Sequence, residues 1–330
     1  MAEYGNFSFL MDTEIVFGRG AEAEAGRLVK KHGGSKALLV YGGGSVKRSG
    51  LLGRVVASLE GADVAFAELG GVHANPRRSF AEAGARRALD EGVDFVLAIG
   101  GGSAIDTAKA ISLGAVPGAD GTFWQYFRGA QPKRSLPVGA VPTIAAAGSE
   151  TSRSAVIVDD IDSGDKVGLW YDPYRPRFAI LNPELTFTVP AAQTAAGSAD
   201  IFAHVVMRYF TPWAGALSDR FGEATMRTVV EFARRVVETP DDYAARAELL
   251  LCASFAHNDL SFVGKPEFAS GEHGLEQQLS GYYDFPHGAG LAVIMPAMLA
   301  YFLRHGSEEQ AARVARFGRE VFGAETAEEG

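Results

Sequence analysis

The chain has 330 residues, of which 47% are hydrophobic and 22% charged, so it is a globular protein long enough for two domains. Its net charge of −9 argues against nucleic acid as a partner, because phosphate binding requires a basic surface. We find no apolar run near the roughly 20 residues of a membrane helix. The N-terminus has no basic region typical of a signal peptide. A single cysteine, Cys252, excludes an internal disulfide, so we expect a cytoplasmic protein with Cys252 in its core.

The first part of the chain alternates short β-branched runs with Ala-rich helical stretches. This pattern is typical of an α/β domain in which helices flank a parallel sheet. We predict strands within residues 36–41, 63–72, 93–100, 138–150, 154–160 and 177–190 of this sheet. From about Pro190 onward, Ala, Leu, Glu and Arg at helical spacing replace the β-branched runs. The sequence therefore predicts an α/β domain over 1–188 and an all-α domain over 189–330, whose last residues complete no obvious packed element.

Two glycine-rich turns each follow a predicted strand and precede a helix. Glycines let the backbone approach an anion, and the helix N-terminus supplies free N–H donors. Neither turn is a GxGxxG or P-loop motif, and a tight turn that needs a positive φ is the plain alternative. Two such turns, the second followed by an acid, favour a dinucleotide. The candidate contacts are Gly42, Gly43, Gly44 and Ser45 in the first turn, with Gly100, Gly101, Gly102, Ser103 and Asp106 in the second.

The first turn also indicates which dinucleotide binds. An NAD site places an acid where it can bond the ribose 2′-OH, whereas an NADP site offers neutral or positive donors. The run after the strand supplies Ser45, Lys47 and Arg48 and no acid. We therefore favour NADP(H) over NAD(H).

Four residues of the helical half are candidate metal ligands. Asp200 and His204 stand at i and i+4, so on a helix they share one face. His273 follows about seventy residues later, and His287 stands between a proline and a glycine. One carboxylate and three imidazoles suit a divalent first-row metal such as Fe, Zn or Ni.

Each of these residues also has a plain structural interpretation. A lone histidine in an apolar helix is more often a buried core residue, and Asp200 could simply begin a helix. The other histidines differ in context. His32, His73 and His305 stand in turn-like segments that indicate solvent exposure, and His257 is ambiguous.

Six motifs in order give the chain a resemblance to a known family. They are GGVHANP (70–76), GGGSAIDTAK (100–109), PTIAAAGSE (142–150), NPELT (182–186), GSADIFAHVV (197–206) and YYDFPHGAGLAVIMP (282–296). Together they resemble the iron-containing (group III) alcohol dehydrogenases, in particular the NADPH-dependent butanol dehydrogenase branch. The resemblance implies a dehydroquinate synthase-like architecture, with the metal facing the cleft between the two domains.

The resemblance also implies roles for individual residues. Asp200, His204, His273 and His287 would hold the catalytic metal, and the turn from Gly100 to Ser103 would contact the pyrophosphate. The remaining cofactor contacts would be Asn75, Thr143, Ser152 and Lys166.

The implied reaction is hydride transfer between NADPH and an aldehyde or primary alcohol polarised by the metal. Fe(II) is favoured and Zn(II) is possible, because four protein ligands leave room for substrate only when coordination expands. The partner would be a small aldehyde or alcohol, and the chain would form a homodimer.

Two alternatives stay open: a lyase resembling dehydroquinate synthase, and a non-catalytic dinucleotide-binding protein. The lyase is disfavoured because no cluster of Lys and Arg for a phosphorylated substrate is evident near the ligands.

The chain departs from the family in two respects. Family members commonly carry a second histidine four residues after the third ligand, where this chain has Gln277. Glutamine forms hydrogen bonds but relays no proton at neutral pH, so we expect slower turnover with intact metal binding. The family also continues through further helices. We therefore expect exposed apolar surface on the helical domain.

Overall fold

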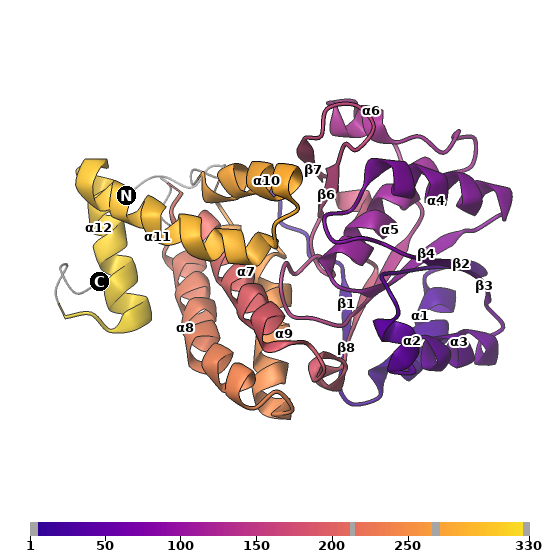
Figure 1. Ribbon diagram of the computed structural model, residues 1–330, viewed down its shortest axis with the longest axis horizontal. Coiled ribbons are helices and arrows are strands. Elements are labelled where there is room, and N and C mark those ends of the chain that lie inside the picture. Colours follow the sequence, from indigo (N-terminus) through magenta and orange to yellow (C-terminus); the bar gives the residue numbers. More distant parts are fainter. Residues whose placement is uncertain (1–5, 212–214, 266–270, 326–330) are drawn as a thin grey trace.

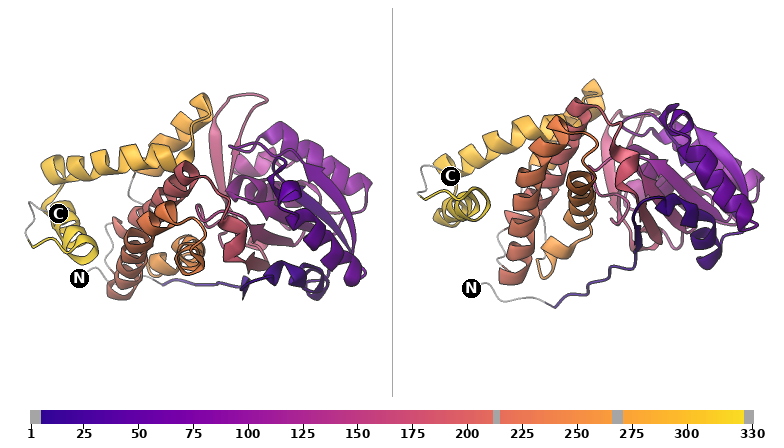
Figure 2. Two further views of the ribbon diagram at one scale, coloured as in Figure 1. Left: turned by 60° about the horizontal axis from the view of Figure 1, so that its bottom comes forward. Right: turned by 90° about the horizontal axis from the view of Figure 1, so that it is seen from below.

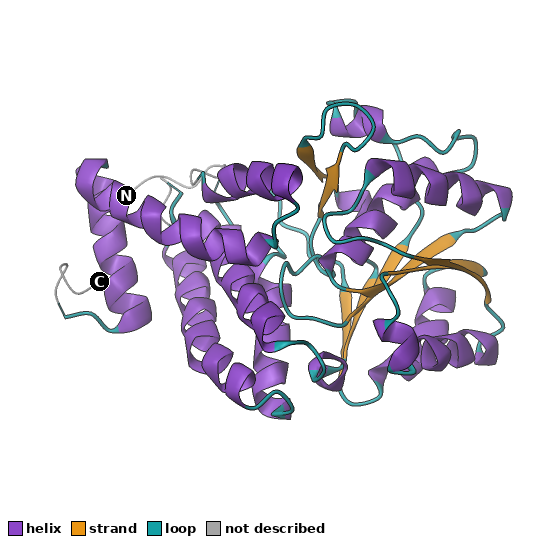
Figure 3. Cartoon of the chain, viewed as in Figure 1, coloured by secondary structure: helices purple, strands orange, loops and turns teal. Residues whose placement is uncertain are grey.

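The structure is a computed structural model that describes residues 6–211, 215–265 and 271–325. An α/β domain is followed by a helical domain (Figure 1), and Figure 3 shows that the strands lie in the α/β domain. This arrangement agrees with the predicted fold class. The change from strands to helices falls after residue 181 and before residue 191, while the exact boundary at 188 stays a prediction.

The main sheet has six parallel strands in the order β1-β8-β5-β4-β2-β3. The chain runs outward from β2 to β3 and then returns to place β4 on the other side of β2. The strand order therefore reverses between β2 and β4, the point at which open α/β sheets bind ligands at their carboxyl edge. The strands are β1 (Glu14–Phe17), β2 (Lys36–Tyr41), β3 (Ala65–Gly70), β4 (Phe95–Gly100), β5 (Val138–Pro142) and β8 (Phe178–Leu181).

Helices cover both faces of this sheet because its buried strands are apolar on both sides. Along β2, Leu38 and Val40 belong to one buried cluster, and Ala37 and Leu39 belong to another. The first cluster includes α4 and α5, and the second includes α1 and α3. The helices of this domain are η1 (Ala21–Glu24), α1 (Ala25–Lys31), α2 (Ser45–Arg48), α3 (Leu51–Gly61), α4 (Arg78–Asp90), α5 (Gly102–Gly114), α6 (Trp124–Phe127), η2 (Asp172–Tyr174) and η3 (Pro183–Thr186).

Two details of the sheet differ from the sequence-based expectation. The run 154–160 does not extend the sheet; β6 (Ser154–Val158) pairs antiparallel with β7 (Lys166–Trp170) in a separate hairpin. The acidic turn 159–165 joins the two strands, and its short length favours a hairpin over a crossover to the main sheet. The sequence analysis also missed β1, a four-residue edge strand beside β8. The segment before β1 runs from the sheet along the helical domain (Figure 2).

The helical domain packs around one apolar core. Ile201 and Val205 of α7 meet Met226 of α8 and Leu249 of α9 in this core. Residues Gly318–Phe322 form a short π-helix in which Val321 is buried. This part of the tail therefore contributes to packing, contrary to expectation, while the small and acidic residues at its end, 326–330, lie outside the described residues. The helices are α7 (Ala191–Tyr209), α8 (Ala216–Glu238), α9 (Tyr243–Ala256), η4 (Leu260–Phe262), α10 (Glu272–Tyr283), α11 (His287–His305), α12 (Glu308–Phe317) and η5 (Gly318–Phe322).

Helix α11 corrects the expectation that no apolar run approaches the length of a membrane helix. Among the described residues it is the one helix whose 19 residues and mean hydropathy of 1.2 would allow it to cross a membrane by length and composition. It packs against α7 and α10 and begins with a candidate metal ligand, His287, so it belongs to the packed helical domain.

Apolar side chains are exposed on α10 and α11, as the sequence led us to expect. Tyr283 is 77% exposed and Val293 72%, and Leu275 and Tyr301 are also largely exposed.

The remaining cysteine and histidine predictions are mostly met. Cys252 is buried in the helical core, and burial raises the pKa of its thiol to about 12. His73 and His305 are exposed. His32 is instead half-buried, because its ring lies near Phe178 and its Nε2 bonds Glu14.

Candidate active site

A cavity of 1230 Å³ joins the two domains. Residues of both glycine turns contribute to its wall, and so do residues of α7, α10 and α11. The cavity thus connects the reversal point of the sheet with the helical domain. All four candidate metal ligands line it: Asp200, His204, His273 and His287.

Asp200 and His204 are held together by helix geometry. Both lie on α7 and are buried, and His204 Nε2 is 3.4 Å from Asp200 Oδ1. Gly197, one turn earlier, lets α7 approach the α/β domain, because a Cβ there would lie 2.3 Å from the carbonyl oxygen of Ala145. The i, i+4 spacing therefore places Asp200 and His204 on one face of α7, as predicted.

His273 and His287 reach the same point from two other helices. The ligand atoms of Asp200, His204 and His273 all lie within 4.8 Å of one another. His287 Nε2 lies 3.8 Å from Asp200 Oδ1. A Cβ at Gly288 would lie 2.0 Å from the carbonyl oxygen of Ala196, so only glycine lets α11 begin this close to α7.

The donor atoms of this cluster fit a divalent cation. Among the described residues, Asp200 Oδ1, both ring nitrogens of His204 and His273 Nε2 have no hydrogen-bond partner although they are buried. Burial lowers the pKa of His204 and His287 well below the ordinary value, so their rings are in the neutral form that binds metals. Burial raises the pKa of Asp200 to about 7, so its ionised form requires a nearby positive charge. A divalent metal would meet each of these requirements.

Two buried glutamates orient two of the histidines. Glu276 Oε2 bonds Nδ1 of His287, and Glu272 Oε1 lies 3.2 Å from Nδ1 of His273. Each carboxylate thereby leaves Nε2 of its histidine free toward the cluster, the usual arrangement of metal-ligating histidines. Glu276 lies behind His287 and outside the cavity lining.

The second glycine turn lies where a phosphate would bind. Gly100 has a φ of 153°, and Gly101 caps α5, which begins at Gly102. A Cβ at Gly101 would lie 2.9 Å from Ile144 Cγ2, so the turn is closely packed. The first turn of α5 supplies N–H donors and the positive end of the helix dipole. Gly100, Gly101, Gly102, Ser103 and Thr143 all line the cavity.

Asp106 and Lys166 line the cavity but are already bound to neighbours. Asp106 accepts hydrogen bonds from Ser149 Oγ and the Val156 amide, and burial raises its pKa. Lys166 donates to Asn75 Oδ1 at 2.9 Å and to Ser280 Oγ at 2.8 Å, and burial lowers its pKa to about 8. Lys166 of β7 therefore joins the two domains at the cavity wall through Ser280 of α10.

Four predicted cofactor residues do not lie on the cavity wall. Gly42 and Ser45 of the first turn line it, whereas Gly43 and Gly44 do not. Lys47 lies over the Tyr41 ring, 3.6 Å from Glu68. Ser152 is fully buried, and its hydroxyl bonds Ser154. Direct cofactor contact by these four residues stays a prediction.

The sequence analysis missed an ion pair in the cavity wall. Glu22 is 3% exposed, accepts from Arg54 Nε at 2.8 Å and from Asn182 Nδ2 at 2.9 Å, and lines the cavity together with Arg54. The run after β2 contains no acid, but the fold brings Glu22 to the same end from η1. No local motif points to this pair.

Gln277 and His257 complete the wall near the metal ligands. Gln277 lines the cavity one helical turn after His273, as the spacing on α10 predicts. His257, which the sequence left ambiguous, is buried and lines the cavity with its ring stacked on His204.

Comparison with known proteins identifies relatives along the whole chain. Residues 12–183 match the family model described as iron-containing alcohol dehydrogenase, and residues 194–330 match its C-terminal counterpart. NADH-dependent butanol dehydrogenase A of Clostridium acetobutylicum is 39% identical over 320 residues, 96% of this chain and 80% of that protein. The NADPH-dependent aldehyde reductase YqhD of Escherichia coli is 34% identical over 296 residues, 89% of this chain and 75% of that protein.

Solved structures agree with these matches. The crystal structure of NADH-dependent butanol dehydrogenase A from Thermotoga maritima superposes with a TM-score of 0.92 at 37% identity. The match covers 98% of this chain and 79% of that one.

Proposed function

The chain belongs to the iron-containing alcohol dehydrogenase family, and from this premise we propose that it reduces aldehydes with NADPH at a metal held by Asp200, His204, His273 and His287. That it is a metal-dependent alcohol dehydrogenase or aldehyde reductase follows from the family. The proposal adds the residues and the cofactor preference. The observation that carries it is the close approach of the ligand atoms of Asp200, His204 and His273, with His287 Nε2 3.8 Å from Asp200 Oδ1. The cavity that they line also contains a glycine turn at a helix N-terminus.

The metal would supply Lewis-acid polarisation of the substrate oxygen, and Fe(II) is our preferred metal over Zn(II). Asp200 contributes the one negative charge of the ligand set, and the neutral histidines complete it. Glu272 and Glu276 keep His273 and His287 turned toward the cavity.

The rest of the cavity wall would position the nucleotide. The turn from Gly100 to Ser103 offers backbone donors for the pyrophosphate. Gln277 stands beside His273, where its amide can bond the substrate or the nicotinamide end of the cofactor. Because glutamine relays no proton at neutral pH, the proton that completes aldehyde reduction would come through water or the cofactor ribose.

The preference for NADPH is supported by Ser45, which lines the cavity in a turn without acidic residues. Arg54 adds a guanidinium to the same wall, although Glu22 is paired with it. Relatives of both cofactor types exist, since the butanol dehydrogenases named above use NADH and the aldehyde reductase uses NADPH.

The other two functions that the sequence left open have less support. Among the described cavity-lining residues, Arg54 and Lys166 are the only lysine or arginine side chains, which is too few for a phosphorylated lyase substrate next to a dinucleotide. A non-catalytic role gives no reason for the unpartnered ligand atoms. We further propose a homodimer in the cytoplasm that acts on small aldehydes and alcohols.

Steady-state assays with a panel of straight-chain aldehydes test this function. We expect NADPH oxidation with simple aldehydes, a lower kcat/KM with NADH, and loss of activity with a chelator. Nucleotide binding without any turnover across the panel would support the non-catalytic alternative instead.

A further inference from the structure

The three histidines of the proposed metal centre differ in what fixes their rings. His273 and His287 each have a glutamate at Nδ1. His204 has none, because neither of its ring nitrogens has a hydrogen-bond partner among the described residues. The orientation of the His204 ring must therefore come from the side chains packed against its faces.

His257 packs against His204. The two ring centroids are 4.1 Å apart and the planes differ by 25°, which is a stacked contact. The neighbouring contact with His273 is longer and more tilted, at 4.7 Å and 40°. Of the two rings that restrain His204, the ring of His257 is thus the closer and the more nearly parallel.

His257 is itself fixed by atoms of the α/β domain. Its Nδ1 lies 2.6 Å from the carbonyl oxygen of Ala147, so Nδ1 carries the proton and donates. Its Nε2 then accepts from Ser154 Oγ at 3.0 Å. Since both nitrogens are used, His257 has no free atom with which to ligate a metal in this arrangement.

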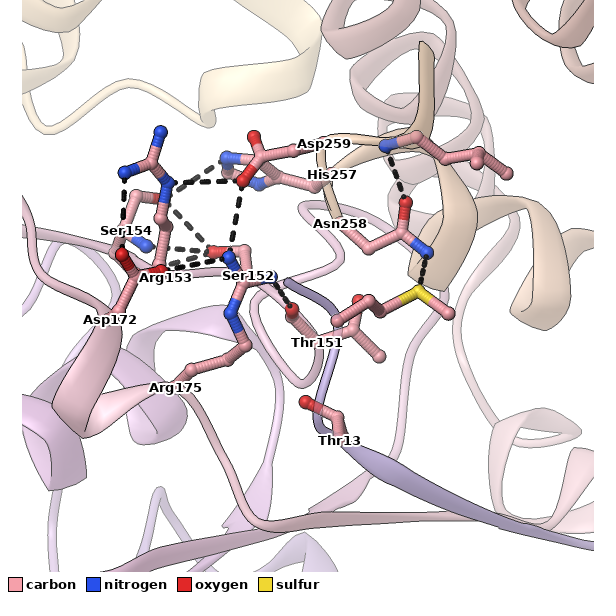
Figure 4. Close-up of polar contacts among 12 residues, drawn as sticks. Thr13, Thr151, Ser152, Arg153, Ser154, Asp172, Arg175, His257, Asn258 and Asp259 are labelled. Carbon is pink, nitrogen blue, oxygen red and sulfur yellow. Dashed lines mark hydrogen bonds and ion pairs between the residues drawn. The ribbon is translucent and has the colours of Figure 1, made fainter. Parts of the chain in front are cut away.

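The segment after His257 is anchored to the same domain. Asp259, with a φ of 70°, accepts from Arg153 Nε at 3.1 Å and from Arg175 at 3.2 Å. Figure 4 shows both arginines converging on Asp259, with His257 beside Ser154. Two ion pairs and two hydrogen bonds therefore hold the segment that follows α9 against the α/β domain.

The loop that carries Ala147 also packs tightly on α9. A Cβ at Gly148 would lie 2.1 Å from the carbonyl oxygen of Ala253, and Thr151 Oγ1 donates to the carbonyl oxygen of Ser254 at 2.6 Å. Ala147 itself lines the cavity. The position of the His257 ring is consequently set by the nucleotide-binding side of the molecule.

We propose that His257 is a positioning residue of the metal centre, which orients His204 by ring stacking in the way that Glu272 and Glu276 orient the other two histidines. This inference rests on the proposed metal site. It assigns His257 no ligand atom and no proton transfer. It predicts that the ring of His257, rather than its hydrogen-bonding capacity alone, determines the affinity and geometry of the site.

Titration of the metal-free protein with Co(II), followed by visible absorption, tests the inference. We expect His257→Ala to weaken Co(II) binding about tenfold, the lower end of the range for residues that orient metal ligands, and to alter the absorption bands. His257→Phe keeps a ring against His204 and should retain most of the affinity and the band shape. Thermal unfolding of each variant shows that it is folded.

Cys252→Ala is the matched control, because Cys252 is buried on α9, the helix that ends just before His257, but does not line the cavity. It should lower stability and leave Co(II) binding unchanged. If the wild type binds Co(II) and folded His257→Ala binds it as tightly as the wild type does, or more tightly than folded His257→Phe does, the positioning role is wrong while the metal centre stands. If the wild type binds no Co(II), the proposed metal centre itself fails, and the inference fails with it.

Discussion

His204 Nε2 lies 3.4 Å from Asp200 Oδ1, and both atoms are buried. His287 Nε2, from the start of a different helix, lies 3.8 Å from the same oxygen. Neither contact is a hydrogen bond. Imidazole nitrogens at these distances from a carboxylate oxygen leave room for one cation between them. The proposed function depends on this arrangement.

Asp200→Asn should remove most metal binding while preserving the fold. The amide has nearly the same shape but no negative charge, so a divalent cation loses its one anionic ligand. We expect more than about a hundredfold loss of affinity, since even residues behind the ligands cost 10–100-fold. Metal content after dialysis measures the loss, and Asp241→Asn, at an exposed site outside the cavity lining, is the control. Full metal content in Asp200→Asn would contradict the ligand assignment.

Glu276→Gln should weaken metal binding less than loss of a ligand does. Glutamine still accepts from Nδ1 of His287, but it no longer stabilises positive charge on the ring, so we expect about tenfold weaker binding. Calorimetric titration with Zn(II) measures the change. Glu308→Gln, on the surface of α12, should bind as the wild type does. Equal affinities for both variants would show that Glu276 has no orienting role.

Gln277→His should increase turnover, because it restores a group that can relay a proton in the cavity. General acid–base catalysis contributes about 10²–10⁴-fold where it is well placed, and we expect at least the lower part of that range. The rate should acquire a pH dependence near the ordinary histidine pKa. Gln278→His, one residue later and exposed, is the matched control. Unchanged rate and pH profile in Gln277→His would mean that this position does not limit turnover.

Ser45→Asp should reverse the cofactor preference. A carboxylate on the cavity wall repels a 2′-phosphate and can bond a ribose hydroxyl. We expect kcat/KM for NADPH to fall by at least about tenfold, with a smaller change for NADH, because like charges placed together cost several kcal/mol. Lys133→Ala, at an exposed site outside the cavity lining, should leave the ratio unaltered. A similar drop for both cofactors would indicate general damage to the turn.

Asp219 should stabilise the helical domain in a pH-dependent manner. Burial acts to raise its pKa, but hydrogen bonds and charges of Arg313 and Lys265 outweigh it, so the pKa in the folded state is below the ordinary value. The stabilisation is therefore fully present above about pH 4, the unfolded value, and is lost as the pH falls through the folded pKa.

Asp219→Asn tests this dependence. We expect the substitution to lower the free energy of unfolding by about 3–5 kcal/mol at pH 7, since it leaves the buried Lys265 ammonium unpaired. Urea unfolding from pH 3 to 7 should show the gap between wild type and variant closing at the acid end. A gap that stays constant with pH would contradict the proposed linkage.

Local sequence patterns predicted the parts of the fold that depend on neighbouring residues. The apolar runs predicted β2 and β4 with the glycine turns that follow them. The i, i+4 spacing predicted that Asp200 and His204 share one face of a helix. Features that depend on contacts distant in sequence were not predicted. Glu22 reaches the wall of the cavity from η1, and Glu276 turns toward His287 on the next helix. His257 gave no signal, because a buried histidine in a helix is usually a core residue. The run 154–160 was read as part of the sheet because β propensity does not reveal which strand is the partner.

Reconstitution of the metal-free protein tests the central claim most directly. NADPH oxidation by an aldehyde is measured after chelation, after addition of one equivalent of Fe(II), and in Asp200→Asn treated identically. We predict no turnover after chelation, recovery with Fe(II) in the wild type, and no recovery in the variant. Turnover that survives chelation, or that Fe(II) restores equally in Asp200→Asn, would contradict a metal centre at Asp200, His204, His273 and His287.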